Sequence, residues 1–217
     1  MAGEFHKHIK QGGKAVSIYE ACVGKFKDAI SMEKLGANRI ELCDNLLEDG
    51  TTPSYGTIKT TIANVKIPVM VIIRPRGGSF EYSREEVEIM KEDIKIAKEL
   101  GAHGVVIGAL VHSNIDIKTV RELVEISKPM SVTFHMAFDE IEDKFSAIDQ
   151  LVSLQVDRIL TKGGKVNALE GKDELKALVQ YANGRITIMP GKGVTKENRQ
   201  YILDYTGATE IHGSKVV

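Results

Sequence analysis

The chain has 217 residues, of which 42% are hydrophobic and 27% charged, as in an ordinary globular protein. Its 29 lysine and arginine residues and 30 aspartate and glutamate residues leave a net charge of −1, which gives no electrostatic basis for binding nucleic acid or a membrane surface. No apolar run reaches the roughly 18 residues that span a bilayer, and no signal-peptide pattern follows Met1. Two cysteines are too few for a disulfide framework. We therefore expect a cytoplasmic protein of one domain.

The first 16 residues are polar and aperiodic, with a break at Gly12-Gly13. We expect a flexible N-terminal arm or an expression remnant here, followed by a single domain over residues 17–217. His6 and His8 alternate along the arm and are a weak metal-binding candidate, because a histidine pair on a solvated tail usually binds nothing.

The rest of the chain alternates short β-type runs with amphipathic stretches. The clearest helical pattern covers residues 84–100, where apolar residues recur at spacings of three and four from Val87 to Ala97. Ser83 and Glu86 predict a capping box at its start. Further helix starts are predicted at Thr52-Pro53, Asp116 and Thr195. The β-type runs cover residues 17–22, 39–43, 68–76, 104–110, 131–135, 158–161, 185–189 and 209–214.

This alternation predicts an α/β fold of eight parallel strands. From Glu20 to Ser214 there are 194 residues over seven intervals, or about 28 per β-α unit, which suits a TIM-type (β/α)8 barrel. A doubly wound open sheet has units of the same length and is the alternative. Only three residues follow Ser214, so the eighth helix is predicted to be missing. The groove this leaves between the first and seventh helices favours a homo-oligomer.

Function in such barrels gathers at the C-terminal ends of the strands, where alternate side chains face one shared mouth. Many polar residues hold these positions, and burying them costs several kcal/mol unless they pair with one another or with a ligand. They are predicted to form the candidate catalytic site, with Asp139 from the loop after the fifth run. The set is Glu20, Glu41, Arg74, Arg76, His135, Asp139, Thr161 and His212.

Two interpretations of this mouth stay open. The first is a structural ion-pair network in which Glu20 and Glu41 neutralise Arg39, Arg74 and Arg76. The second is a site for a small anion, for which the two arginines of the 73–76 segment form a double fork suited to a carboxylate or phosphate.

Acid–base chemistry and phosphate binding have candidates of their own. His135 and Asp139, four residues apart, are predicted to be an acid/base pair. Loops after the seventh and eighth strands hold phosphate in many barrels, and here they carry glycines and a lysine. The predicted anion-binding residues are Gly191, Lys192, Gly193, Gly213 and Ser214. The basic, glycine-rich 161–165 loop is a less specific candidate.

The two cysteines, Cys22 and Cys43, lie at the ends of neighbouring strands, on the face shared with Glu20 and Glu41. Paired strands lie about 4.8 Å apart, so the two sulfurs are expected to approach each other. Thiolates are soft ligands that favour copper(I), whereas two sulfurs alone do not make a closed zinc site. The alternative is that both are small buried hydrophobes.

The motifs around these residues resemble those of the CutC family, from about Ile18 to the end of the chain. The resemblance implies a TIM barrel in the cytoplasm, a tendency to form homo-oligomers, a role in copper homeostasis, and copper(I) binding at Cys22 and Cys43. It implies no organic cofactor. The motifs that carry it are Glu20-Ala21-Cys22-Val23, Asn38-Arg39-Ile40-Glu41-Leu42-Cys43, Thr51-Thr52-Pro53-Ser54, Ile73-Arg74-Pro75-Arg76-Gly77-Gly78, Thr133-Phe134-His135-Met136-Ala137-Phe138-Asp139, Leu160-Thr161-Lys162-Gly163-Gly164 and Ile188-Met189-Pro190-Gly191-Lys192-Gly193.

The chain departs from the family pattern at three places. Met136 stands where many members have arginine, Lys162-Gly163 replaces Ser-Gly, and Lys192 replaces a glycine. By strand parity Met136 is expected to point away from the barrel.

Three functions compete at this point: a copper(I)-binding protein, a barrel enzyme acting on a small phosphorylated or carboxylated metabolite, and a catalytically silent barrel that binds a partner. The two cysteines do not account for the arginines, histidines and glycine loops of the mouth. The residue pattern therefore favours the enzyme, whereas the family resemblance favours copper.

Overall fold

The computed structural model describes residues 17–217. The arm expected over residues 1–16, with His6 and His8, lies outside the described residues. The barrel strands are β1 (Ile18–Val23), β2 (Arg39–Leu42), β3 (Val69–Ile72), β4 (Gly104–Ile107), β7 (Ser131–Phe134), β8 (Arg158–Thr161), β9 (Thr187–Pro190) and β10 (Glu210–Gly213).

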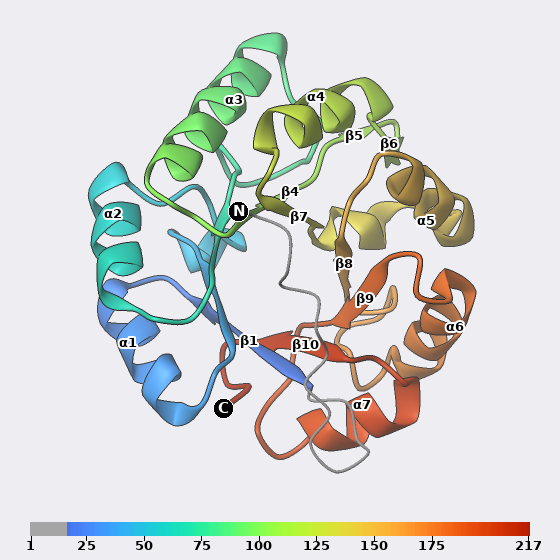
Figure 1. The fold of residues 1–217 in the computed structure, drawn as a ribbon. Helices are drawn as coiled ribbons and strands as arrows, with labels where there is room; N and C mark the ends of the chain where they lie inside the picture. The colour runs from blue at the N-terminus through green and yellow to red at the C-terminus, as the bar shows by residue number, and fades with distance from the viewer. Residues whose placement is uncertain (1–16) are drawn as a thin grey trace.

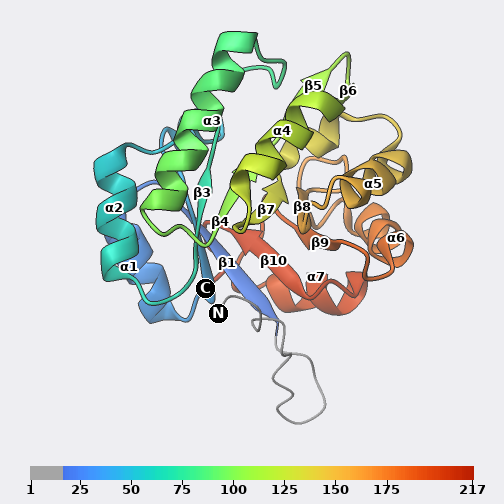
Figure 2. The same ribbon diagram turned by 45° about the horizontal axis from the view of Figure 1, so that its top comes forward.

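These eight strands form one parallel sheet in the order β10-β1-β2-β3-β4-β7-β8-β9. Figure 1 looks along the axis of the resulting ring, with the helices outside it, and Figure 2 shows the strands tilted against that axis. The ring joins the first strand to the last, since Glu20 of β1 stands opposite Arg39 of β2 and His212 of β10. Within the described residues β9 and β10 form no ladder, although they lie side by side (Figure 1). The predicted TIM-type barrel is confirmed.

Seven α-helices and two short 3-10 helices connect the strands, and within the described residues no helix follows β10. The α-helices cover the outside of the ring (Figure 1). They are α1 (Phe26–Leu35), η1 (Leu46–Glu48), α2 (Tyr55–Asn64), α3 (Arg84–Glu99), α4 (Ile117–Ser127), η2 (Met136–Glu140), α5 (Lys144–Ser153), α6 (Lys172–Ala182) and α7 (Arg199–Thr206).

Helix starts follow the capping chemistry of the sequence in part. Ser83 and Glu86 form the predicted capping box of α3, and the Asp116 carboxylate caps α4 by accepting a hydrogen bond from the Thr119 amide. The other two predicted starts are wrong by a few residues. Ser54, just after Thr52-Pro53, caps α2, and Thr195 lies in a bridge to Lys215 ahead of α7.

Two segments differ from the prediction for a physical reason. The run at 68–76 ends as a strand at Ile72, because Arg74 and the residues after it turn into a loop above the barrel. The run at 104–110 continues into a small hairpin of β5 (Leu110–Val111) and β6 (Asn114–Ile115). Its turn residues, His112 and Ser113, have φ values of 48° and 56°, a conformation that neither residue type signals in a sequence.

The two faces of the sheet carry different side chains, as strand alternation requires. Ile40 and Leu42 of β2 belong to the large apolar layer between sheet and helices. Cys43, just past β2, packs inside the barrel with Met70 and Ile72, beside Cys22. The large apolar layer thus faces the helices, and the polar side chains of the strands face the barrel interior and mouth.

None of the described helices has the length and apolar character needed to cross a membrane.

Candidate functional site

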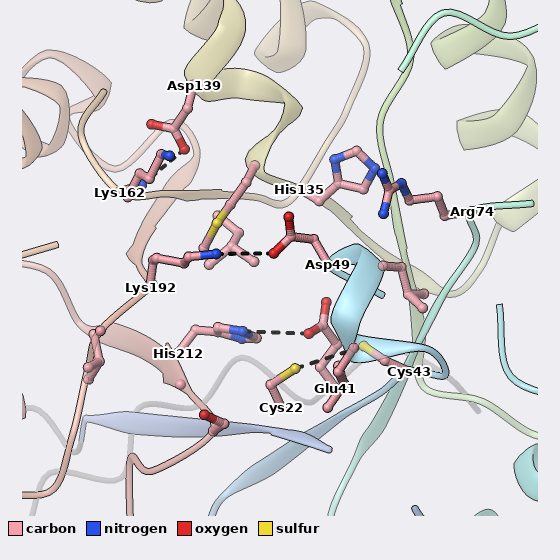
Figure 3. A pocket seen from close by; sticks show the side chains of 18 of the residues that line it. Cys22, Glu41, Cys43, Asp49, Arg74, His135, Asp139, Lys162, Lys192 and His212 are labelled. Carbon is pink, nitrogen blue, oxygen red and sulfur yellow. Dashed lines mark hydrogen bonds and ion pairs between the residues drawn. The ribbon is translucent and has the colours of Figure 1, made fainter. Parts of the chain in front are cut away.

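A cavity of about 710 Å³ opens at the C-terminal ends of the barrel strands. Figure 3 shows it from close by: Cys22, Cys43, Glu41 and His212 gather on one side, and Arg74 lies at another end beside His135. The loops after the strands form its rim. A space of this size is typical of a small-molecule site.

Many of the sequence-predicted site residues line this cavity, and four do not. Glu20 and Thr161 are buried below it, the Gly191 backbone packs behind it, and Arg76 lies outside it. Predicted residues that do line it are Cys22, Glu41, Cys43, Arg74, His135, Asp139, Lys192, Gly193, His212, Gly213 and Ser214.

The two thiols meet because β1 and β2 pair in register. Cys22 stands opposite Glu41, and the Cys43 amide donates to the Val23 carbonyl, which holds the chain just past β2 against β1. The Sγ atoms of Cys22 and Cys43 are 3.9 Å apart. The hydrogen bond between them, helped by nearby His212, lowers the pKa of Cys22 well below its usual value despite burial. The same hydrogen bond, with burial, raises the pKa of Cys43.

His212 connects the thiols to the barrel interior. Its Nδ1 lies 2.9 Å from Glu20 Oε1, and its Nε2 lies 3.5 Å from Glu41 Oε2. Burial opposes charge on the ring, but the carboxylate of Glu41, the Cys22 sulfur and Glu20 outweigh it and raise the pKa of His212. Burial and the neighbouring Cys22 sulfur raise the pKa of Glu41.

Beneath His212 lies a buried ion network. Arg39 pairs with Glu20 through Nε, and its Nη2 lies 2.5 Å from Glu210 Oε2. Arg158 reaches the same Glu210 oxygen at 3.1 Å. Burial raises the pKa of Glu20, but Arg39 and His212 more than offset this and hold it well below its usual range. A structural network thus exists, and it keeps Glu20 ionised to orient the imidazole of His212.

Arg74 and Arg76 do not make the expected double fork. The Arg74 side chain is buried under the loops, where its guanidinium donates to the carbonyl oxygens of Glu48, Gly50 and Gly78. Arg76 turns outward and pairs with Glu86, its Nε 2.5 Å from Oε1. The strand ends before both arginines, so strand parity no longer governs their direction.

His135 and Asp139, the expected acid/base pair, form no hydrogen bond with each other in the described structure. His135 Nδ1 accepts a hydrogen bond from the Ala137 amide at 3.1 Å, which caps η2. Asp139 instead accepts from the Thr161 hydroxyl at 2.8 Å and from the Gly164 amide at 2.8 Å. Burial and the positive charge of Arg74 lower the pKa of His135 to about 3, so its imidazole is neutral.

The loops expected to bind phosphate contribute unevenly. The Gly191 amide donates to the Thr161 carbonyl, so it is not available to a ligand. Lys192 has a φ of 69°, and its Nζ forms an ion pair with Asp49 at 3.1 Å across the pocket (Figure 3). Met136 also lines the pocket, contrary to the parity expectation, because the chain enters η2 after β7.

Some residues of the site were missed from the sequence. Asp49, Phe80, Arg158 and Glu210 carry no motif, and their partners lie far away in the chain. Lys162 was singled out only weakly, and it lines the pocket. The sequence places Glu210 in the predicted strand 209–214 but gives no sign of its ion pairs. No local pattern marks Asp49 or Phe80 as a site residue.

The donor atoms around Cys22 fit a soft metal ion. Single ligand atoms of Cys22, Glu41 and His212 lie within 4.8 Å of one another, and Cys43 lies behind Cys22. Two metal–thiolate bonds of about 2.3 Å each reach across at most about 4.6 Å, so one ion can contact sulfurs 3.9 Å apart. The set combines the two soft sulfurs with the imidazole of His212 and the carboxylate of Glu41, which already lie against each other.

Comparisons with known proteins agree on one family. The CutC family model matches residues 17–217. The chain is 48% identical to a mouse copper homeostasis protein cutC homolog over 206 residues, covering 94% of this chain and 76% of the relative. It is 44% identical to a CutC family protein of Enterococcus faecalis, covering 92% of this chain and 100% of the relative. The crystal structure of CutC from Streptococcus agalactiae superposes with a TM-score of 0.89 at 42% identity, over 93% of this chain and 100% of the other. The fold, the residues of the mouth and these matches together place the chain in the CutC family.

Proposed function

We propose that this protein binds copper(I) through Cys22 and Cys43, as part of copper homeostasis. The observation that carries the proposal is the 3.9 Å separation of the two sulfurs at the wall of an open pocket. Soft thiolates select copper(I) over harder ions. The names of the relatives in mouse and human, which are copper homeostasis proteins, support the same metal.

The residues around the sulfurs suit such a site electrostatically. Cys22 already favours the thiolate, and Cys43 gives up its proton when the ion arrives. Two thiolates and one copper(I) ion carry a net charge of −1, and the cationic His212 offsets it. Glu20 holds that imidazole in place through Nδ1.

A copper(I) competition titration under anaerobic, reducing conditions tests the proposal. Wild type, Cys22→Ser, Cys43→Ser and the double variant are compared against a chelator of known affinity. We expect one tight equivalent in wild type and its loss in each single variant, because both sulfurs are needed. A variant with His6 and His8 replaced by glutamine distinguishes copper bound by these two histidines from copper bound by the cysteines. Equal binding by wild type and the double variant would overturn the proposal.

A second candidate function rests on the size of the cavity. Its volume of about 710 Å³ far exceeds what one ion needs and falls in the range of small-molecule sites. Lys162 and Lys192 line it, and Arg74 lies in its wall. We propose that the pocket also takes a small anionic metabolite, as a barrel enzyme would.

Thermal denaturation in the presence of phosphorylated and carboxylated metabolites tests this second function. A ligand that binds the folded state raises the melting temperature, and the stabilisation grows as the logarithm of 1 plus its concentration over Kd. We expect at least one compound to stabilise the copper-free protein increasingly as its concentration rises, and this stabilisation to be lost when Lys162 is changed to methionine. The proposal would be refuted if the Lys162 variant were stabilised as much as wild type. It would also be refuted if no compound of either class raised the melting temperature.

A further inference from the structure

Arg74 has an unusual electrostatic position. The residue is 3% exposed, and among the described residues no carboxylate lies within ion-pair distance of its guanidinium. The buried Arg39 and the half-buried Arg158 both have Glu210 as a counter-ion. The guanidinium of Arg74 donates to three backbone carbonyls and has the Tyr82 hydroxyl as a neighbour, and within the described part of the chain its Nε has no acceptor within hydrogen-bond distance. A buried charge without a counter-ion is costly, and a bound anion would remove that cost.

His135 presents a second unpaired donor beside it. Because Nδ1 accepts from the Ala137 amide, the proton of the neutral ring belongs on Nε2. That Nε2 is buried and has no hydrogen-bond partner among residues 17–217. Unpaired buried donors are rare in folded proteins and call for an explanation.

The two groups share one corner of the pocket. Figure 3 shows the imidazole of His135 and the guanidinium of Arg74 next to each other, and both residues line the cavity. The ring of Phe80 packs on both, with its centroid 4.8 Å from that of His135 and 4.9 Å from Cζ of Arg74. The corner therefore holds one uncompensated positive charge and two N–H groups without acceptors.

We propose that Arg74 and His135 bind the carboxylate of a small molecule whose remainder occupies the cavity toward Cys22 and Cys43. The proposal rests on the second function above and names the class of its ligand. Two unpaired donors match the two oxygens of a planar carboxylate, whereas a phosphate would bring a further charged oxygen with no donor. Since neither donor atom is open to solvent, the proposal includes a shift of the side chains packed around them, among which Phe80 contacts both residues.

In this site His135 is a neutral hydrogen-bond donor and does not act as a base. Its Nδ1 is already occupied by the backbone of η2, so the ring is fixed in the tautomer that offers Nε2–H. Arg74 supplies the charge, and the loop carbonyls that hold its Nη atoms leave Nε as its unpaired donor. The pair thus recognises a carboxylate because Arg74 offsets its charge and the two N–H donors match its two oxygens.

Calorimetric titration of copper-free protein with malonate, succinate and inorganic phosphate tests the proposal, with chloride at equal ionic strength as the blank. We expect a dicarboxylate to bind wild type and to lose about 10- to 100-fold in affinity in Arg74→Met, the range for a hydrogen bond to a charged group. Arg76→Met is the matched control, because that guanidinium lies outside the pocket, and it should bind as wild type does.

Arg74 also holds three loop carbonyls, so a second pair of variants keeps the test valid if Arg74→Met fails to fold. His135→Asn keeps an acceptor near the Nδ1 position and removes the Nε2 donor, whereas His135→Gln keeps a donor near Nε2. We expect Asn to weaken dicarboxylate binding and Gln to retain it. The reverse order would indicate a structural role and overturn the proposal.

The remaining outcomes separate this proposal from the function on which it rests. Dicarboxylate binding that all Arg74 and His135 variants retain refutes the carboxylate corner but leaves an anion pocket. Binding of phosphate alone refutes the ligand class. No binding of any of the three probes by wild type overturns the corner, and the metabolite screen then decides whether the pocket takes another ligand. Copper(I) binding in each variant, measured separately, should match wild type.

Discussion

Replacing Glu20 by glutamine should strongly destabilise the protein, although the two side chains have nearly the same shape. Both carboxylate oxygens are used: Oε1 lies 2.9 Å from His212 Nδ1, and Oε2 pairs with Arg39 Nε. The residue is fully buried, so water cannot replace either partner. Removing one member of a buried ion pair costs about 3–5 kcal/mol. Arg39 keeps Glu210, which places the expected loss near the lower end, about 3 kcal/mol.

A loss of about 3 kcal/mol is a large share of a typical stability of roughly 5–15 kcal/mol, and for a chain of this size it lowers the melting temperature by about 6–12 °C. Urea unfolding of Glu20→Gln followed by circular dichroism at pH 7 measures it, with Glu99→Gln on the exposed face of α3 as the control. The control should unfold as wild type does. A loss below about 1 kcal/mol in Glu20→Gln would show that the network contributes little net stability.

The same variant carries a pH signature. The pKa of Glu20 is lowered in the folded protein from an ordinary value of 4.5, because Arg39 and His212 outweigh the effect of burial. The unfolded chain therefore binds a proton below pH 4.5 that the folded chain does not, and this stabilisation is lost as pH falls. The difference in stability between wild type and Glu20→Gln should shrink below pH 4.5. A difference that stays constant with pH would refute the assignment of the charge to Glu20.

Three further predictions follow from other parts of the structure. Because burial lowers the pKa of His135 from 6.5 to about 3, wild type should lose stability as pH falls through that window, and His135→Gln should flatten that part of a urea-stability profile. Gly104→Ala should cost about 1–3 kcal/mol in urea unfolding, because the new Cβ would lie 2.5 Å from the Ser131 carbonyl oxygen; an unchanged midpoint would mean that β4 shifts freely. Asp49→Asn should change stability by less than about 1 kcal/mol, since the ion pair with Lys192 is exposed, and a larger loss would point to a structural role for that contact.

The barrel was predictable because its signals are local and repeated. Alternation in β2 separates Ile40 and Leu42, which face the helices, from Glu41 and Cys43, which face the barrel interior. Parity and the pairing of neighbouring strands were enough to bring the two cysteines together, and the sulfurs are 3.9 Å apart. These features need only the period of a strand and the order of the elements.

The same reasoning failed beyond the strand ends. Arg74 and Arg76 lie in a loop, where the alternation of a strand no longer applies, and one turns inward while the other turns outward. His135 caps a short 3-10 helix and Asp139 lies within it, so their side chains point to different partners. Local patterns cannot find the Lys192–Asp49 ion pair either, because the two residues are 143 positions apart and meet only in the closed barrel.

The order in which the chain is synthesised has a consequence for the thiol site. Cys22 lies in the first strand and Cys43 directly follows the second, whereas His212, which lies against Cys22 and Glu41, arrives on the last one. About 170 residues, His212 among them, follow Cys43 in the sequence, so both thiols are synthesised long before the imidazole. Docking of β10 against β1 therefore both closes the barrel and completes the site. A nascent chain that stalls before β10 would expose the sulfurs without the imidazole that sits beside them in the finished protein.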